Sequence, residues 1–331
     1  MPSAIPLHRI ILNHTKKKAT MTTKQAWIGF WLLALIWGSS FFFIRIGVEH
    51  VPPIQLVFIR TGTAALGLNL VLLVRGKRIP FWGRGMIDLL VLGIVNTVFP
   101  FLLITWGETR IDSGIASVLQ GTAVLFTLII AHFLFDDERI TWTKSIGLLI
   151  GFAGVIVLAS RSMVDSPIRT DLLGQLAIVG AAFCYAIGSS YSRVAMKSRL
   201  EPMVVSAGSM TIAAITTGVL AYLAPLFGGQ APINLLTLEA STFSAVLALG
   251  LVNTFGAYLI YYSVIATLGA ARASMVTYVI PVIGLLLGIL FLNEQVDARL
   301  LIGAALIIVG VLSAGLNLPV LLRRFRAQPA E

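Results

Sequence analysis

Residues 26–44 of the chain read AWIGFWLLALIWGSSFFFI, a run of nineteen residues without a charged side chain. As an α-helix rising about 1.5 Å per residue, this run is about 28 Å long, close to the roughly 30 Å of a bilayer's hydrocarbon core. Similar runs recur along the 331 residues, which are 57% hydrophobic and only 11% charged, with a mean hydropathy of +0.93. Soluble domains carry roughly a quarter charged residues. The composition therefore excludes a soluble enzyme, a nucleic-acid-binding domain and a disulfide scaffold, and it predicts a polytopic membrane protein.

The apolar runs predict an all-α fold with ten transmembrane helices. Continuous apolar runs favour helices over the strands of a membrane barrel, which alternate over about ten residues. The expected spans are 26–44, 54–74, 87–106, 114–135, 144–160, 172–195, 203–227, 243–263, 270–292 and 300–318.

Basic residues are unevenly distributed between the segments that join these spans. With a cytoplasmic N-terminus, 18 of the 24 Lys and Arg fall in inner segments and Arg60 lies within a span. Five fall in outer segments: Arg45, Arg110, Arg161, Arg169 and Arg299. Because cytoplasmic loops are enriched in Lys and Arg, this distribution predicts a multi-pass protein of the cell (inner) membrane with both termini in the cytoplasm. The basic residues behind the net charge of +10 thus serve to orient the protein in the membrane, and we expect no nucleic acid as a partner. The expected partners are the lipid bilayer and a small-molecule substrate.

Residues 1–20 form a basic extension without the features of a signal peptide. Two interpretations stay open: translation starts at Met21, or residues 1–20 are a disordered basic tail. A second basic tail, also expected in the cytoplasm, is 319–331. Cys184 is the single cysteine, so no intrachain disulfide is possible, and we interpret it as a packing residue.

The second half of the chain restates the first at an offset of 150 to 157 residues. Each half holds five spans, an odd number, so the two halves enter the membrane in opposite orientations. The matching positions are Gly38-Ser39-Ser40 with Gly188-Ser189-Ser190, Pro52 with Pro202, Asn96-Thr97 with Asn253-Thr254, Ala116-Ser117 with Ala273-Ser274, Glu138 with Glu294, and Gly147 and Gly154 with Gly303 and Gly310.

An inverted repeat of this kind is typical of secondary transporters, in which the substrate path lies near the middle of the membrane between the halves. The alternatives are a passive helical bundle, an intramembrane enzyme, which needs a nucleophile–base pair or metal ligands at membrane depth, and a channel, which needs a selectivity loop. The sequence offers neither set of groups and no re-entrant loop. It also lacks a phosphate-binding loop and a His-Glu-x-x-His motif, so we expect no enzyme, no metal and no cofactor.

Several short motifs resemble the EamA-type carriers of the drug/metabolite transporter superfamily. They are Trp37-Gly38-Ser39-Ser40-Phe41, Arg60, Asn96, and Leu292-Asn293-Glu294-Gln295 leading to Gly303. The resemblance implies two EamA repeats, at 21–160 and 172–318 with a linker at 161–171, in a basket of ten helices. It also implies export of an amino acid, another metabolite or a drug. Import or exchange of a similar solute stays the alternative, because no residue indicates direction.

One position departs from the family pattern. Members carry a proline in both the fourth and the ninth span, whereas this chain has Pro281 in the ninth and Gly121-Thr122-Ala123-Val124 in the fourth. A proline frees a backbone carbonyl and permits a kink. We therefore expect the two halves to flex unequally, with Pro281 as a gating candidate.

Polar and aromatic side chains within the spans are candidates for substrate binding, since polar groups are costly in a membrane. They fall along helical faces, and interhelical hydrogen bonding is the open alternative. Aromatic and amide groups suit a partly apolar ligand with an amine or carboxylate end. The candidates are Trp37, Asn96, Trp106, Ser117, Gln120, Asn253, Tyr258, Tyr261, Ser274, Thr277 and Tyr278.

Arg60 is the only basic residue well inside a span, and Glu108 or Asp112 on the same side is its expected partner. Arg60 and Glu108 are candidates either for a gate that binds an anionic group or for a structural ion pair. No carboxylate is expected at mid-membrane, so either any proton coupling runs through peripheral acids, or the carrier exchanges solutes or facilitates their diffusion. Glycine faces at Gly147, Gly151 and Gly154 and at Gly303 and Gly310 suit packing within a monomer or a homodimer contact.

Overall fold

The computed structural model describes residues 21–136, 138–163, 171–195 and 200–315. The tails at 1–20 and 319–331 and most of the 161–171 linker lie outside the described residues. Within them, nine helical segments are long and apolar enough to cross a membrane, and Ala298–Ala314 is apolar but shorter. The expected all-α polytopic fold is confirmed.

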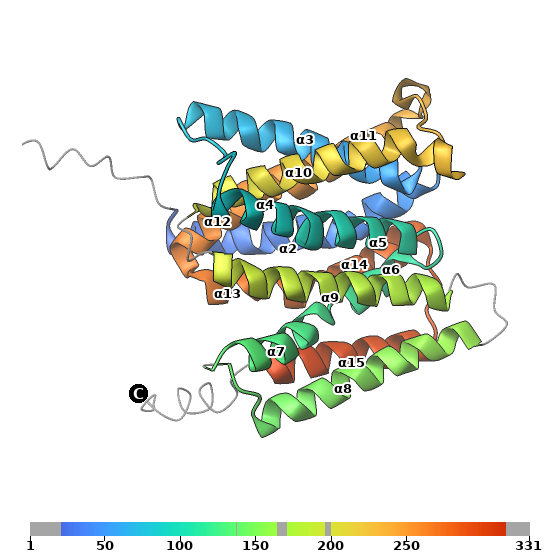
Figure 1. The fold of residues 1–331 in the computed structure, drawn as a ribbon. Coiled ribbons are helices and arrows are strands. Elements are labelled where there is room, and N and C mark those ends of the chain that lie inside the picture. The colour runs from blue at the N-terminus through green and yellow to red at the C-terminus, as the bar shows by residue number, and fades with distance from the viewer. Residues whose placement is uncertain (1–20, 137, 164–170, 196–199, 316–331) are drawn as a thin grey trace, which may run out of the picture.

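The helices follow one another as five spans in each half (Figure 1). The first half consists of α2 (Thr23–Val48), α3 (Pro53–Val74), α4 (Arg84–Gly93), the π-helical turn η1 (Ile94–Val98), α5 (Phe99–Gly107), α6 (Ser113–Gln120), α7 (Ala123–Leu134), α8 (Trp142–Ala159) and η2 (Ser160–Met163). The second half consists of α9 (Leu172–Ala195), α10 (Pro202–Leu223), η4 (Ala224–Phe227), η5 (Leu235–Thr237), α11 (Ala240–Gly250), the π-helical turn η6 (Leu251–Gly256), α12 (Ala257–Leu268), α13 (Ala270–Ser274), α14 (Val276–Leu292) and α15 (Ala298–Gly315).

Helix starts follow local chemistry. Thr22 and Gln25 form a capping box at the start of α2, which satisfies two backbone N–H groups that have no partner in the first turn. Prolines open α3 and α10, where the missing N–H costs nothing.

The packing of the helices repeats between the two halves. The first helix of each half packs against the third and fourth spans of the other: α2 against α11, α12 and α14, and α9 against α5, α6 and α7. The second spans, α3 and α10, pack together at one edge of the bundle, and the fifth spans, α8 and α15, pack together at the opposite edge (Figure 1). The first, third and fourth spans of each half therefore lie between these edges.

The glycine faces of the fifth spans are used within the chain. A Cβ on Gly147 would lie 2.8 Å from the carbonyl oxygen of Gly310, and one on Gly154 would lie 2.7 Å from that of Gly303. Only hydrogen at these positions permits such close approach of α8 and α15. Of the two expected roles, packing within the monomer is the one that these contacts support.

The third and eighth spans are interrupted at equivalent positions. Asn96-Thr97 lies in η1 and Asn253-Thr254 lies in η6, so the aligned pair occupies a π-helical turn in both halves. Such turns free carbonyl groups and often mark functional sites. Here the Thr254 hydroxyl donates to the carbonyl of Leu249, five residues earlier.

The helices of the fourth and ninth spans are not interrupted where the proline pattern predicts a kink. The fourth has no proline, yet α6 ends at Gln120 and α7 begins at Ala123, with the Thr122 hydroxyl bonded to the Leu119 carbonyl at 2.6 Å. Pro281 instead lies inside the continuous helix α14, and the ninth span breaks at Met275. A glycine followed by a hydroxyl residue that competes for a backbone carbonyl thus interrupts a helix without proline.

Candidate functional site

Arg60 lies in the interior of the bundle, on α3, and its side chain is buried (8% exposed). Its Nε donates to the Thr254 hydroxyl at 3.0 Å, and its guanidinium carbon lies 4.0 Å from the centroid of the Phe101 ring. The expected ion pair with Glu108 or Asp112 is absent among the described residues, so this part of the sequence prediction is corrected. A hydroxyl and an aromatic face take the place of the carboxylate.

The remaining donors of Arg60 make no hydrogen bond to the described residues. A guanidinium has five N–H donors, and within the described part of the chain only Nε makes a hydrogen bond. Tyr185 of α9 and Tyr258 of α12 lie within electrostatic reach of the same charge. Arg60 therefore presents unused donors beside two phenol groups.

Aromatic side chains extend this site toward α2. Tyr258 stacks on Tyr262 with ring centroids 6.0 Å apart, and the ring of Tyr261 lies 5.2 Å from that of Trp37. Trp37, Tyr185, Tyr258 and Tyr261 are each half-buried. Tyr185 was not among the expected residues, although its spacing of three residues before Gly188 places it on the face of α9 that bears the repeated Gly-Ser-Ser motif.

The aligned asparagines pack against the Gly-Ser-Ser motif of the opposite half. Asn96 lies against Gly188 of α9, where a Cβ on the glycine would collide with it. Asn253 is buried and its Nδ2 donates to the Ser39 hydroxyl of α2 at 3.0 Å and to the Ile36 carbonyl. The motif thus provides the small residues that admit an amide from the third span of the other half.

The other predicted residues are divided between helix packing and exposed positions. Ser117 is buried and bonds the carbonyls of Gly114 and Pro281 at 2.8 and 3.3 Å, which supports the interhelical alternative. Pro281 is buried in the same contact, whereas Gln120 and Tyr278 are half-buried. Ser274 and Thr277 are exposed, and Trp106 is 38% exposed with Arg110 stacked 4.5 Å from its ring.

Glu294 joins the ninth span to the fourth at one end of the bundle, which we call the closed end. One carboxylate oxygen accepts from the backbone N–H and the hydroxyl of Ser113, at 2.7 and 2.6 Å, and the other accepts from the N–H of Gly114 at 2.8 Å. These donors belong to the first turn of α6, where a negative charge is favoured. The carboxylate therefore fastens α6 to the end of α14.

The residue before Glu294 explains how its side chain reaches α6. Asn293 ends α14 in the left-handed conformation, with φ 54° and ψ 35°, and the Glu294 N–H returns to the carbonyl of Gly288 at 3.2 Å. Asparagine tolerates this conformation better than most residues with a side chain. The Asn-Glu pair of the motif thus turns the chain and supplies the cap.

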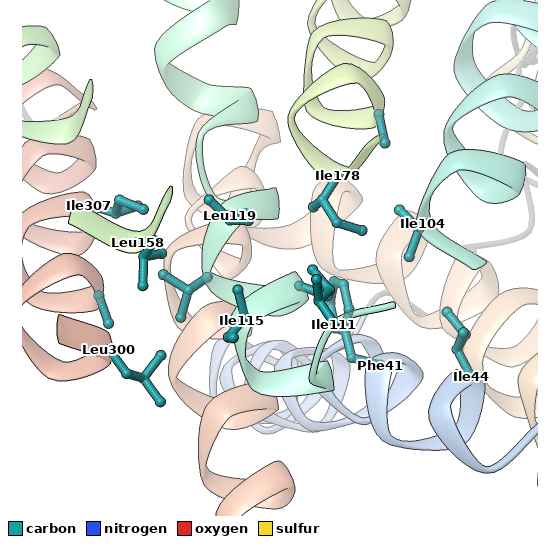
Figure 2. Packing of buried hydrophobic residues seen from close by; sticks show 14 of the residues in the cluster. Phe41, Ile44, Ile104, Ile111, Ile115, Leu119, Leu158, Ile178, Leu300 and Ile307 are labelled. Atoms are coloured by element: carbon teal, nitrogen blue, oxygen red, sulfur yellow. The ribbon is translucent and has the colours of Figure 1, made fainter. Parts of the chain in front are cut away.

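Apolar packing surrounds α6 at the closed end. Ser113–Leu119 are all buried, and Figure 2 shows Ile115 and Leu119 between Leu158 on one side and Ile178 on the other. Gly284 and Gly288 of α14 admit Ser117, Ser113 and Glu294 at contact distances that no side chain would permit. Only small residues on α14 allow α6 to lie this close.

The equivalent segment of the second half is not enclosed in this way. Helix α13 makes its main contacts with its chain neighbours α12 and α14, and Ala270, Arg272 and Ser274 are exposed. Glu138, which aligns with Glu294, pairs instead with Lys144 at 3.8 Å and Arg193 at 3.5 Å. Among the described residues, the fourth and ninth spans therefore close one end of the bundle and make no equivalent contact at the other.

Comparison with known proteins agrees with this architecture. Residues 25–160 and 172–316 each match the EamA-like transporter family. A protein of Archaeoglobus fulgidus, named an uncharacterized transporter, is 30% identical over 287 residues, covering 87% of this chain and 97% of that protein. The inner membrane transporter YedA of Escherichia coli (strain K12), also named uncharacterized, is 32% identical over 266 residues, 77% of this chain and 79% of YedA.

Two further similarities are more distant. A probable amino-acid metabolite efflux pump of Escherichia coli (strain K12) is 26% identical over 286 residues, 85% of this chain and 91% of the pump. One solved crystal structure has the same fold, with a TM-score of 0.61 at 20% identity, covering 92% of this chain and all of that one. Both halves of the chain match the family model, and relatives match over most of their length: the chain belongs to the EamA-like transporter family and is a multi-pass membrane transporter.

Proposed function

We propose that this transporter is a secondary carrier that moves a small organic metabolite, amino acid or drug by alternating access. The observation that carries the proposal is the contrast between two equivalent segments: α6 is buried against α2, α9, α14 and α15, whereas α13 is largely exposed. A pair of similar halves held in different states is what alternating access requires. The repeats involved are 21–160 and 172–318.

The orientation follows from the basic residues. Most Lys and Arg lie in the segments assigned to the cytoplasm, together with both termini. Arg45, Arg110 and Arg161 are among the few basic residues of outer segments, and they lie at the closed end, which is therefore the outer end. The described structure is then the form closed to the outside. An inner-membrane location and export are supported by the names of YedA and of the amino-acid metabolite efflux pump.

Arg60 and the aromatic groups near it form the proposed binding site. The unused guanidinium donors suit a carboxylate, and the rings of Tyr185, Tyr258 and Trp37 suit an apolar side chain. An amino acid or a related metabolite combines both groups.

Counterflow in proteoliposomes tests the carrier, with radiolabelled amino acids offered one class at a time. Uptake should saturate and should accelerate when the same unlabelled amino acid is present inside. Uptake that rises linearly with concentration and is not accelerated would refute a carrier and favour a channel. For direction, overexpression should raise the resistance of cells to toxic amino-acid analogues, and lower resistance would indicate import.

A further inference from the structure

The Glu108 carboxyl is fully enclosed in the protein without a bonding partner. Its exposed fraction is 0%, and neither side-chain oxygen has a hydrogen-bond partner among the described residues. Its bonded groups belong to the backbone: the carbonyl accepts from Nη1 of Arg45 at 2.8 Å, and the N–H donates to the carbonyl of Ile104 at 2.9 Å. Nη2 of Arg45 pairs with Glu49 at 3.3 Å. A carboxylate that has lost water and gained no donor is far costlier than a neutral carboxyl.

The charges that face Glu108 come from several elements. Glu108 follows the last residue of α5, outside the span. The charged groups that face it are Arg45 of α2, Arg60 of α3 and Glu294 after α14, and Glu49, which follows α2, pairs with Arg45. Burial raises the pKa of the Glu108 carboxyl well above its usual range, and the negative charge of Glu294 raises this pKa further, against the lowering influence of Arg45 and Arg60. Glu294 accepts three hydrogen bonds, at 2.6 to 2.8 Å, from Ser113 and Gly114.

We propose that Glu108 is a proton-binding site whose carboxyl holds a proton while the closed end is shut and releases it to water when that end opens. The step is a bare proton transfer, which leaves a solvated carboxylate and changes no other bond. Because the shut form binds the proton more tightly, acid on the outer side favours closure. This preference is complete below the pKa of the open form and is lost as the pH rises through the pKa of the shut form. Coupling of this proton to solute movement rests on the proposed carrier function.

Infrared spectroscopy of the purified protein in lipid nanodiscs tests the site without any solute. The C=O stretch of a protonated carboxyl should be present at neutral pH in the unmodified protein and lost in Glu108→Gln. Glu49→Gln is the matched control, because the half-exposed Glu49 is paired with Arg45, and it should keep the band. Absence of the band at neutral pH in the unmodified protein, or its persistence in Glu108→Gln, would overturn the proposal.

A second measurement reports the linked movement. Spin labels at positions 109 and 295, in a Cys184→Ser background, span the closed end. The distance between the labels should lengthen as the pH rises in the unmodified protein and stay short in Glu108→Gln. The same pH dependence in both proteins would overturn the proposal.

A further variant covers the case in which Glu108→Gln fails to fold. Glu294→Gln removes the neighbouring charge and loosens the contact that holds the closed end shut, and both effects should lower the titration midpoint of the infrared band. An unchanged midpoint would overturn the proposal. These outcomes are separate from those of the transport assay: the band without counterflow would support the proton site and refute the carrier, and counterflow without the band would do the reverse.

Discussion

Replacing Glu294 with glutamine should open the closed end. Three donors converge on this carboxylate, the N–H and hydroxyl of Ser113 and the N–H of Gly114, at 2.6 to 2.8 Å. Glutamine keeps the side-chain length, but its amide nitrogen cannot accept from the Gly114 N–H, and its oxygen carries no charge. In the open form water bonds the same donors, so the variant penalises only the closed form.

The size of the effect follows from the bonds lost. A hydrogen bond to a charged group contributes about 1.5–3 kcal/mol net, so losing one bond costs about 2 kcal/mol even before the other two weaken. Since about 1.4 kcal/mol is tenfold in an equilibrium, the ratio of closed to open forms should fall about 30-fold. Glu138→Gln is the matched control, because it removes only the two longer pairs with Lys144 and Arg193, and partly exposed pairs contribute about 0–1 kcal/mol each.

Double electron–electron resonance between labels at positions 109 and 295 measures the closed and open populations directly. Glu294→Gln should add a longer distance component that Glu138→Gln lacks. If both variants keep the short distance, the cap does not hold the closed end. If both lengthen it equally, charge in general, and not this contact, controls the opening.

Three further substitutions test packing, the turn and the binding site. Gly310→Ala places a Cβ 2.7 Å from the Gly147 carbonyl oxygen and should destabilise the protein by about 1–3 kcal/mol in thermal unfolding. Gly180→Ala is the control, because the nearest neighbour of its Cβ would be 3.6 Å away, and it should leave the stability unchanged. Equal melting temperatures of the two variants would contradict this. Asn293→Gly should preserve the stability of the protein and the short distance between the labels. Asn293→Val should lower the free energy of unfolding by about 1–2 kcal/mol, because φ at position 293 is positive. A valine variant of unchanged stability would refute the left-handed turn at this position. Arg60→Lys should raise the KM for a carboxylate-bearing solute about tenfold at unchanged protein yield, the loss of one charge-assisted hydrogen bond; lower yield at unchanged KM would indicate a structural role.

Features that depend on local sequence could be predicted. The spans follow from the length of apolar runs, and the pairing of α3 with α10 and of α8 with α15 is consistent with the repeat. The repeat predicted that Asn96 and Asn253 are equivalent, but not that both lie in π-helical turns, because nothing in an Asn-Thr pair specifies a π-helix. That turn depends on how the third span packs against the opposite half, which no local pattern encodes.

Features that depend on contacts between distant segments could not be predicted from the sequence. Glu108 and Asp112 were expected as ion-pair partners because they lie on the same side of the membrane as Arg60. The fold instead brings Thr254, 194 residues away, and Phe101 to the guanidinium. Glu108 reads as an interfacial acid at the end of a span, and only the packing of neighbouring elements removes it from water. Tyr185 lies in an apolar run where its type gives no signal of its closeness to a charge.

The sequence difference between the halves bears on which state is the more stable. At the closed end, Gly284 and Gly288 let α6 and its cap approach α14 without a side chain between them. At the offset of 157 that aligns Ser117 with Ser274, the corresponding residues are Thr127 and Ala131. Closure of the opposite end by the same geometry would therefore have to accommodate a β-branched side chain and a methyl group where glycines meet now. Overpacking of this kind costs about 1–3 kcal/mol, so the form closed at the Glu294 end should predominate in the absence of solute, and solute binding must supply that difference to complete the transport cycle.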